Sequence, residues 1–455
     1  MAKYKSYPEY KDSGVEWLGE IPIRWKTNAL KNICIIINGS TPKSGVEEFW
    51  DGEINWITPA DLSQKSGKTV TESARKITLA GLNSCGTTLV SCDSVIISTR
   101  APIGSLAITS IESCTNQGCK SLATNDASLS KYIYYFLSII TSPLNILGKG
   151  STFLELSTED LSTVRVPLPN GEINEIINFL DHETAKIDNL IEKQQQLIEL
   201  LSEKRQAVIS HAVTKGLHPD VPMKDSGIEW LGEIPKHWQY TKIKHIAILT
   251  PKKSSIRFKY NDKCTFIPME KLKRNSLFTD ENKFINKVIN SYTYFENNDL
   301  LLAKVTPCFE NRNIAIAYGL TNGIGFGSTE IYVLRPTKKI RANYLLYRLQ
   351  EDNFMRAATS AMTGAGGLKR VPSEFLLNYP IAIPPKSEMD EIVESLSQQE
   401  SHYNLLEVNA IQGIQLLQER RTALISAAVT GKIDVRNWVA PASETETLVE
   451  EEVSA

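Results

Sequence analysis

The sequence predicts an α+β fold, in which two tandem bodies of mixed α/β character are joined by two long antiparallel coiled-coil helices with pseudo-twofold symmetry. The first reason is a repeat: "KDSGVEWLGEIPIRW" (11–25) returns as "KDSGIEWLGEIPKHW" (224–238), with twelve of fifteen residues identical. The second is that "LLSEKRQAVISHAVT" (200–214) returns as "LLQERRTALISAAVT" (416–430), with ten of fifteen identical. Offsets of 213 and 216 residues indicate duplicated domains rather than a solenoid of short repeats.

The chain has 455 residues, which is too long for one ordinary hydrophobic core. Each copy has the same order of parts, namely a repeat segment, a body and a long helix. The predicted parts are a first repeat segment (1–25), a first body (26–170), a first helix (171–218), a second repeat segment (219–238), a second body (239–386), a second helix (387–433) and a tail (434–455). We expect the tail to be disordered, because its end is acidic and carries no Lys or Arg.

Apolar residues recur every seven residues through both predicted helices, which is typical of a coiled coil. About 41 residues at ~1.5 Å each would make a rod of roughly 60 Å. Core packing inside one domain is the alternative, but helices of this length seldom stay within one globule. Prolines stand just before both helices, where proline is tolerated. The residues expected at the helix–helix and subunit interface are Leu180, Ile187, Leu201, Val208, Leu396, Tyr403, Leu417 and Leu424.

The bodies are rich in short apolar runs broken by Gly, Pro, Asn and Ser, which predicts strands at 94–99, 300–305 and 331–336. Longer apolar segments predict helices at 131–140 and 342–350. The two bodies differ in charge. Residues 239–380 carry 22 Lys and Arg against 11 Asp and Glu, whereas residues 26–166 carry 12 of each.

Motifs of several enzyme classes are missing from the sequence. We find no glycine-rich cofactor turn with an Asn-Pro-Pro-aromatic loop, no phosphate-binding GxxxxGK[ST] and no HExxH pair. Glu281-Asn282-Lys283 with Asp262 upstream faintly resembles a nuclease metal cluster, but such triplets are common. We therefore predict no catalytic residue and no metal site.

The sequence also bears on the compartment and on two glycine-rich loops. We expect a cytoplasmic protein without a membrane partner, because no apolar run approaches the ~18 residues of a membrane span and "MAKYKSYPEYKDS" has no apolar signal core. "TGAGGLKR" (363–370) and "GKGSTFLEL" (148–156) stand at corresponding places before the two helices. Each loop either cradles phosphates through backbone N–H groups or is simply flexible, and both readings remain open.

The duplicated "DSGxEWLGEIPxxW", the paired long helices ending in "AVTG" or "AVTKG" and the two dissimilar bodies resemble the specificity subunit of a Type I restriction-modification enzyme. Further family-like pieces are "INWITPADL" (54–62), "STRAPIGSLAI" (98–108), "CTNQGCKSL" (114–122), "TPCFENRNIAIA" (306–317) and "GIGFGSTEIYVLRP" (323–336). The second body lacks an "RAPIG" or "NQG" segment, which suggests a different subtype of recognition domain.

The resemblance implies a DNA-reading subunit without its own active site, whose bodies are target recognition domains for the two halves of a bipartite, asymmetric site. It implies that the helices act as a spacer on which two modification subunits dock, bringing S-adenosylmethionine for adenine methylation. Restriction subunits with ATP and Mg²⁺ would join them, and this chain would hold no cofactor. General physics agrees, since paired DNA-binding modules commonly read half-sites separated by an unread gap.

On this interpretation, Lys and Arg would contact phosphates and polar side chains would read base edges, with Asn116 and Gln117 as the better base readers. The candidates in the first body are Thr41, Lys43, Arg100, Asn116, Gln117, Lys120, Lys149 and Thr152. Those in the second body are Lys252, Lys253, Arg257, Lys259, Lys304, Asn311, Arg312, Lys369 and Arg370. Any one of them is otherwise an ordinary solvated residue.

Two other interpretations remain, a structural adaptor whose bodies bind proteins, and an autonomous nuclease or methyltransferase. The basic second body argues against the structural adaptor, and the missing motifs argue against the nuclease or methyltransferase.

The repeat segment is expected to be architectural, with Trp17, Trp25, Trp230 and Trp238 at junctions between helix ends and bodies. Its first copy should close the pseudo-twofold ring beside Gly431, where the second helix ends.

Overall fold

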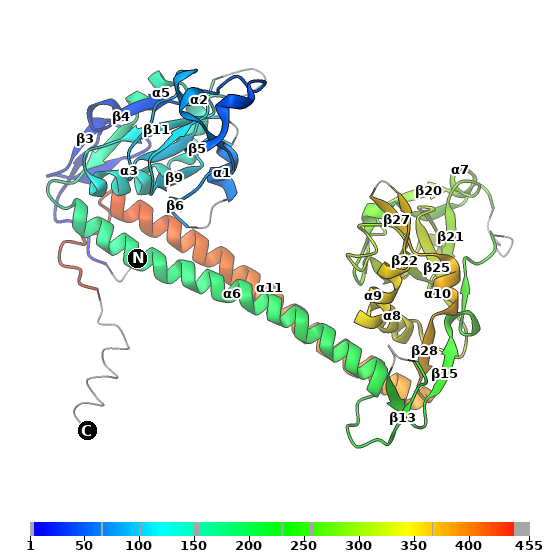
Figure 1. Cartoon of the computed structure of the whole chain (residues 1–455). Helices are drawn as coiled ribbons and strands as arrows, with labels where there is room; N and C mark the ends of the chain where they lie inside the picture. Colours follow the sequence, from blue (N-terminus) through cyan, green and yellow to red (C-terminus); the bar gives the residue numbers. More distant parts are fainter. Residues whose placement is uncertain are drawn as a thin grey trace, which may run out of the picture. The chain divides into compact units, whose positions relative to one another are not determined.

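A computed structural model describes residues 4–64, 67–100, 102–149, 154–228, 232–253, 259–365 and 367–440. The chain divides into two compact units, Met1–Gln194 with Gln412–Ala455, and Gln195–Ile411. Each unit holds one body, one copy of the repeat segment and part of both long helices (Figure 1). Among the described residues, no helix combines the length and the apolar character that crossing a membrane requires.

The long helices are α6 (Ile173–Lys215) and α11 (Lys386–Val429), of 43 and 44 residues. At ~1.5 Å per residue each is about 65 Å long. In the first unit the start of α6 runs antiparallel to the end of α11, and Arg421 Nε lies 2.7 Å from Asp188 Oδ1. In the second unit the end of α6 meets the start of α11, and Arg205 Nη2 lies 3.2 Å from Glu407 Oε2. The α+β class and the antiparallel helices are thus as predicted.

The heptad positions face the interior of this helix pair, as the burial of their side chains shows. The buried residues are Leu180, Ile187, Leu201, Leu396 and Tyr403. The half-buried residues are Val208, Leu417 and Leu424. Leu180 and Leu424 join the main core of the first unit, whereas Val208 and Leu396 join that of the second.

The first body is built on a mixed five-stranded sheet in the order β4-β11-β8-β9-β6 and a three-stranded sheet in the order β10-β5-β7. The strands of this unit are β1 (Tyr10–Asp12), β2 (Glu20–Pro22), β3 (Lys26–Ala29), β4 (Ile35–Asn38), β5 (Trp50–Ile57), β6 (Thr69–Val70), β7 (Lys76–Ile77), β8 (Val95–Ser98), β9 (Leu106–Thr109), β10 (Ser113–Thr115), β11 (Cys119–Ala123) and β12 (Arg165–Leu168). Its shorter helices are η1 (Leu30–Asn32), η2 (Glu47–Phe49), α1 (Pro59–Gln64), α2 (Leu79–Asn83), α3 (Ala127–Ile139), α4 (Thr141–Leu147) and α5 (Thr158–Thr163).

The second body contains two four-stranded sheets, β16-β25-β22-β23 and β20-β17-β24-β21. The strands of this unit are β13 (Met223–Asp225), β14 (Glu233–Pro235), β15 (Gln239–Lys242), β16 (Ala247–Leu249), β17 (Lys263–Ile267), β18 (Leu272–Lys273), β19 (Ser276–Leu277), β20 (Asn282–Phe284), β21 (Thr293–Glu296), β22 (Leu300–Ala303), β23 (Ile314–Ile316), β24 (Ile324–Gly327), β25 (Ile331–Pro336), β26 (Thr363–Ala365), β27 (Leu368–Arg370) and β28 (Pro380–Ile383). Its shorter helices are η3 (Ile243–His245), η5 (Met269–Lys271), α7 (Ile285–Val288), η6 (Thr321–Gly323), α8 (Ala342–Gln350), α9 (Asp352–Ser360) and α10 (Ser373–Asn378).

The two bodies share one plan despite their different sequences. β11 pairs antiparallel with β4 and β8, and β25 pairs in the same way with β16 and β22. A parallel pair follows in both, β10 with β5 and β24 with β17. The strands predicted at 94–99, 300–305 and 331–336 and the helices predicted at 131–140 and 342–350 are confirmed.

A tyrosine fixes each body to a helix end. The Tyr132 hydroxyl of α3 lies 2.6 Å from the Pro167 carbonyl and 2.9 Å from the Val429 carbonyl at the end of α11. In the second unit the Tyr344 hydroxyl of α8 lies 3.2 Å from the carbonyl of Val213, near the end of α6. Each hydroxyl is thus within hydrogen-bond distance of a carbonyl in the last turn of a long helix, where carbonyls have no partner inside their own helix.

The repeat segments fold as the same hairpin in both units. Lys11 pairs with Ile21 across β1 and β2, and Lys224 pairs with Ile234 across β13 and β14. The indoles that follow are fully buried, since Trp25 and Trp238 are 0% and 1% exposed. Their Nε1 groups donate to glutamates at the start of the long helices, Glu172 at 3.3 Å and Glu388 at 3.1 Å. The expected junction positions of these two tryptophans are confirmed.

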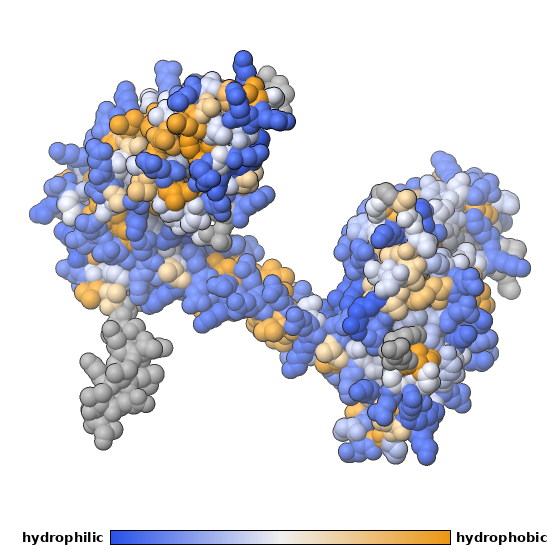
Figure 2. All heavy atoms as spheres, in the orientation of Figure 1, coloured by the Kyte–Doolittle hydropathy of each residue, from blue (hydrophilic) through white to orange (hydrophobic). Residues whose placement is uncertain are grey.

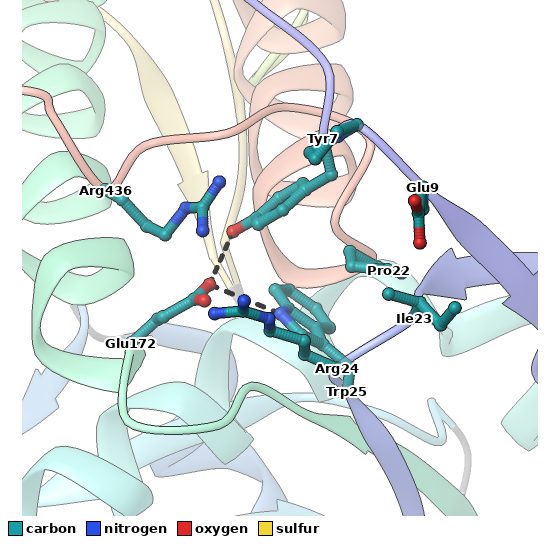
Figure 3. Close-up of a pocket in the computed structure, with 9 residues that line it drawn as sticks. Tyr7, Glu9, Pro22, Ile23, Arg24, Trp25, Glu172 and Arg436 are labelled. Carbon is teal, nitrogen blue, oxygen red and sulfur yellow. Dashed lines mark hydrogen bonds between the residues drawn. The ribbon is translucent and has the colours of Figure 1, made fainter.

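The first hairpin also meets the end of α11, as the sequence predicts. The Tyr10 hydroxyl donates to the Gly431 carbonyl at 3.0 Å, and Pro22 packs against Gly431. Next to this contact lies a cavity of about 190 Å³, where Tyr7 donates a 2.7 Å hydrogen bond to Glu172 (Figure 3). Burial is the first cause, and the Glu172 bond the second, of a pKa of Tyr7 far above its usual range. This hydroxyl therefore stays protonated and bonded at neutral pH.

The structure differs from the predicted architecture at Trp17 and at the start of the tail. The Trp17 ring lies tilted against Phe136 but remains 45% exposed, and Trp230 lies outside the described residues. The first residues of the predicted tail pack against the first unit, where Val435 is buried and Trp438 contacts Phe179 edge-on. They are anchored because an aromatic surface on α6 is available to them, whereas residues 441–455 lie outside the described part.

Candidate nucleic-acid interface

Four segments of the first body come together beside its five-stranded sheet. They are the turn after β4 (39–43), the described residues after β8 (99–100 and 102–105), the β10–β11 turn (116–118) and the described residues before α5 (148–149 and 154–157). Backbone bonds join them, including Ser40 N to the Thr115 carbonyl at 2.9 Å and Leu156 N to the Thr99 carbonyl at 2.8 Å. Candidate residues far apart in sequence thereby share one polar surface.

The candidate side chains of this surface are mostly paired with neighbours. Thr41 bonds to Gln117, Arg100 lies 3.3 Å from Glu155, and Lys149 lies 2.9 Å from Asp160. The Asn116 side-chain oxygen accepts from Gly118 N at 2.9 Å, which leaves its amide nitrogen for other partners. Lys43 is exposed, whereas Lys120 is buried, and Thr152 lies outside the described residues.

Two tryptophans hold the turn that carries Thr41 and Lys43. The Trp56 indole donates to the Ser40 carbonyl at 2.9 Å, and the Trp50 indole donates to the Lys43 carbonyl at 3.2 Å. The guanidinium of Arg75 lies 3.7 Å from the centre of the Trp50 ring, in a cation–π contact. The two indole side chains therefore hold the backbone of the turn that carries Thr41 and Lys43.

The second body has a corresponding surface. Val371 N donates to the Lys304 carbonyl at 2.9 Å, as Leu156 N donates to Thr99 in the first body. The β26–β27 hairpin is exposed, and Lys369 N donates to Thr306 Oγ1 at 3.0 Å. Arg370 makes two 2.9 Å bonds to Glu330, so the structure brings Lys304, Lys369 and Arg370 together.

The other candidates of the second body lie in different surroundings. Lys252 is exposed in the turn after β16, while Lys253 Nζ bonds to the Ile289 carbonyl at 2.5 Å. Lys259 and Asn311 are exposed in loops. Arg312 turns toward the junction of α8 and α9, where it bonds to Asp352 and to the Gln350 carbonyl, each at 2.5 Å. The structure therefore does not bring Arg312 to the β26–β27 hairpin, and Arg257 lies outside the described residues.

Charge pairing shapes the electrostatics of both surfaces. The Arg370 bond holds the pKa of Glu330 below its usual range, and bonds from Ser157 and then Lys149 lower that of Asp160. Burial lowers the pKa of Lys120. Each carboxylate thus stays ionised at neutral pH and offsets one cation, so an approaching polyanion must compete with these acids.

Glu155, Asp160 and Glu330 were not predicted from the sequence, because only cations and polar side chains such as amides were expected to contact DNA. An acid that pairs with a contact residue leaves no mark on local sequence, since the partners lie up to 55 residues apart, as with Arg100 and Glu155. The "INWITPADL" segment did include Trp56, but nothing in it distinguished a support for the turn from core packing.

The weak nuclease-like cluster does not form a metal site in the described residues. Lys271 Nζ lies 3.0 Å from both Asp280 and Glu281, and Lys283 lies 3.2 Å from Glu281. Asp262 instead caps a turn by accepting from Lys259 N at 2.9 Å. In the part of the chain that the structure describes, no group of three or more His, Cys, Asp or Glu residues is placed to hold a metal.

Comparison with known proteins identifies the family. The family described as "Type I restriction modification DNA specificity domain" matches residues 22–200 and 235–416, which is more than half of the chain. The EcoAI specificity subunit of Escherichia coli is 35% identical over 232 residues, which cover 49% of this chain and 38% of that protein. The MjaIX specificity subunit of Methanocaldococcus jannaschii is 30% identical over 250 residues, covering 53% and 55%. The matched stretch therefore spans about half or less of these relatives.

Solved structures show the same fold. A chain from a study of complex assembly and conformational transition of the type I R-M system has a TM-score of 0.68 at 16% identity, covering 91% of this chain and 99% of that one. The HsdS subunit from Thermoanaerobacter tengcongensis has a TM-score of 0.50 at 16% identity, covering 91% and 98%. The chain therefore belongs to the Type I restriction modification DNA specificity family and carries that domain twice.

Proposed function

We propose that this chain is the DNA sequence-recognition subunit of a Type I restriction-modification complex, and that each body reads one half of a bipartite, asymmetric site. The observation that carries the proposal is the pair of corresponding polar surfaces, built on one sheet plan from different side chains. Arg100 and Val305 occupy matching places. Arg100 forms a backbone bridge with Glu155, shortly before α5, and Val305 forms one with Arg370 of β27, shortly before α10. A shared frame with different side chains suits two different half-sites.

The proposed role of the helices is to space the bodies and to dock two modification subunits. Support comes from apolar side chains that the helix pair leaves exposed (Figure 2). In the second unit these are Leu197, Leu200, Leu405, Val408 and Ile411, and in the first unit Leu190 and Leu416. Apolar rows of this kind on solvated helices suit partner helices.

Catalysis belongs, in this proposal, to the partner subunits. The modification subunits would bring S-adenosylmethionine for adenine methylation, and restriction subunits would bring ATP and Mg²⁺. This chain would hold no cofactor and would contribute binding and positioning. Turnover by the purified chain given Mg²⁺ or S-adenosylmethionine would contradict this division of labour.

Methylome sequencing of a host with and without this gene tests the proposal. The expected result is one bipartite motif that is methylated at adenine only when the gene is present. Replacing residues 26–166 by another recognition body should then change one half of the motif and leave the other half unchanged. A motif that ignores the replacement, or a change in both halves, would refute the reading of one half-site per body.

The structural-adaptor alternative predicts a different outcome. DNA binding by the proposed subunit should weaken steeply with salt, because phosphate contacts release counterions. The net charge of residues 239–380, with 22 basic and 11 acidic residues, favours this. An adaptor that binds only proteins would show no salt-dependent shift of duplex DNA.

A further inference from the structure

Lys120 is a buried cation, and the side chain that accepts its hydrogen bond is a neutral amide. It lies on β11, opposite Asn38 on β4, and is 8% exposed. Its Nζ donates to Asn38 Oδ1 at 2.8 Å, and the hydroxyl of Thr158 lies 2.7 Å from the same oxygen. A lysine is almost never buried this deeply unless it is paired, so its bond to Asn38 matters for both side chains.

These two bonds fix the orientation of the Asn38 amide. An ammonium group can only donate, so the atom that faces Lys120 must be the carbonyl oxygen Oδ1. The amide nitrogen Nδ2 then points the other way, and Asn38 itself is exposed. Within the described ranges, no acceptor is bonded to this nitrogen.

Asn38 also lies beside the predicted base readers. Gly39 packs so closely on the Asn116 carbonyl that an added Cβ would lie 1.9 Å from its oxygen. Gly39 N also donates to the Cys119 carbonyl at 3.3 Å, which holds the turn against the β10–β11 turn that carries Gln117. The outward amide of Asn38 therefore belongs to the same polar surface as Asn116 and Gln117.

Resting on the proposed function, we propose that Asn38 is a specificity-determining residue of the first body that donates one hydrogen bond to a base acceptor, and that Lys120 is its positioning residue. A free asparagine can donate and accept together, which suits adenine. Asn38 has its oxygen already occupied by Lys120 and Thr158. It can only donate, so it suits an acceptor such as guanine O6, a purine N7 or thymine O4.

The second body supplies an internal comparison. Leu122 and Leu334 hold matching places on β11 and β25, opposite Ile36 and Leu249. Two residues earlier on β25 stands Tyr332, whose hydroxyl donates to the Val371 carbonyl at 2.9 Å. Two residues beyond Leu249 stands Pro251, which has no side-chain donor. The Lys120–Asn38 pair thus belongs to one body, and its effect should fall on one half-site.

The test uses the full chain assembled with its modification subunits, with the methylated motif and duplex binding as readouts. Asn38→Asp turns the donor into an acceptor, so one position of one half-site should shift toward a base that offers an amino group, cytosine or adenine. Asn38→Ala should reduce discrimination at that position roughly tenfold. Asn125→Asp, at an exposed position beyond the far end of β11, is the matched control and should leave the motif unchanged.

Lys120→Met separates positioning from direct contact. If Lys120 positions the amide, discrimination should fall at the same base position while the salt dependence of binding stays the same. If Lys120 instead contacts a phosphate, the slope of affinity against salt should fall by about one and all sequences should weaken alike, which would overturn its assigned role. Thr158→Val removes the other donor at a half-buried site and should give a smaller loss at the same position, which keeps the test open if the Lys120 variant fails to fold.

The outcomes distinguish this inference from the proposed function. If the unaltered chain gives no bipartite motif, the proposed function itself fails. If it gives one and both Asn38 variants keep it, the Asn38 assignment is wrong. Uniform weakening of all sequences by Asn38→Ala would likewise overturn it, since the amide would then contact a phosphate.

Discussion

Burial separates two tryptophans of the same repeat segment at the scale of single residues. Trp25 is 0% exposed and bonded to Glu172, whereas Trp17 is 45% exposed. Trp25→Ala should lower the free energy of unfolding of the first unit by about 3–5 kcal/mol, because it leaves a cavity and takes a donor from a buried carboxylate. Trp17→Ala should cost about 1 kcal/mol. Urea denaturation checks this, and equal losses would show that the segment is not anchored through Trp25.

Gly431 gives a second residue-scale prediction. Its φ is +72°, and an added Cβ would lie 2.3 Å from Pro22 Cδ, so Gly431→Ala should destabilise the contact between the first hairpin and the end of α11 by more than 1 kcal/mol. Gly413→Ala is the control, because Gly413 lies inside α11 with open space around it. That change should stabilise the helix by about 1 kcal/mol. Opposite signs in thermal unfolding are expected, and a stabilising Gly431→Ala would contradict this packing.

Single contact residues were the least predictable part of the site. From the sequence, Lys120 and Arg312 were candidates for DNA contact because both are cations in family-like segments. In the structure Lys120 is buried and bonded to Asn38, and Arg312 is bonded to Asp352. Both outcomes depend on strand register and on loop packing between residues far apart in the chain, which no local pattern encodes.

At the scale of elements, the exposed β26–β27 hairpin should contribute phosphate contacts. Lys369 is exposed on β27, and its backbone N–H is held by Thr306, so the side chain is free to reach a polyanion. Lys369→Ala should weaken DNA binding about equally for all sequences and reduce the salt slope by about one. Lys386→Ala, at an exposed lysine that begins α11, is the control and should leave the slope unchanged. A changed half-site in the Lys369 variant would instead assign it to base reading.

Elements whose apolar residues recur at a regular spacing were predicted well. The pairing of strands that are far apart in the sequence was not. The heptad stripe predicted helices at 171–218 and 387–433, and the structure has them at Ile173–Lys215 and Lys386–Val429. The repeat predicted matching segments, and they form matching hairpins. Strands β8 and β22 were visible as apolar runs, but the parallel pairing of β10 with β5 joins residues 58 apart, such as Cys114 and Trp56. A single sequence carries no signal for such pairing.

At the scale of the whole molecule, the continuity of α6 and α11 bears on the unread gap of the proposed DNA site. Both helices pass from one compact unit into the other, with the boundaries at Gln194 in α6 and at Ile411 in α11. Seven residues inserted at both boundaries preserve the facing of the apolar stripe, because the coiled-coil pattern repeats every seven residues. The matched control inserts seven residues into α6 alone, which shifts its stripe against α11 and should lower stability.

The double insertion adds about 10 Å of helix, which corresponds to about three base pairs at 3.4 Å each. Methylome sequencing should therefore show the same two half-sites with a gap longer by up to about three base pairs. Both half-site sequences should survive because neither polar surface is touched. A changed half-site with an unchanged gap would exclude the helices as the spacer, and would leave the bodies to set the distance by contacting each other or their partner subunits.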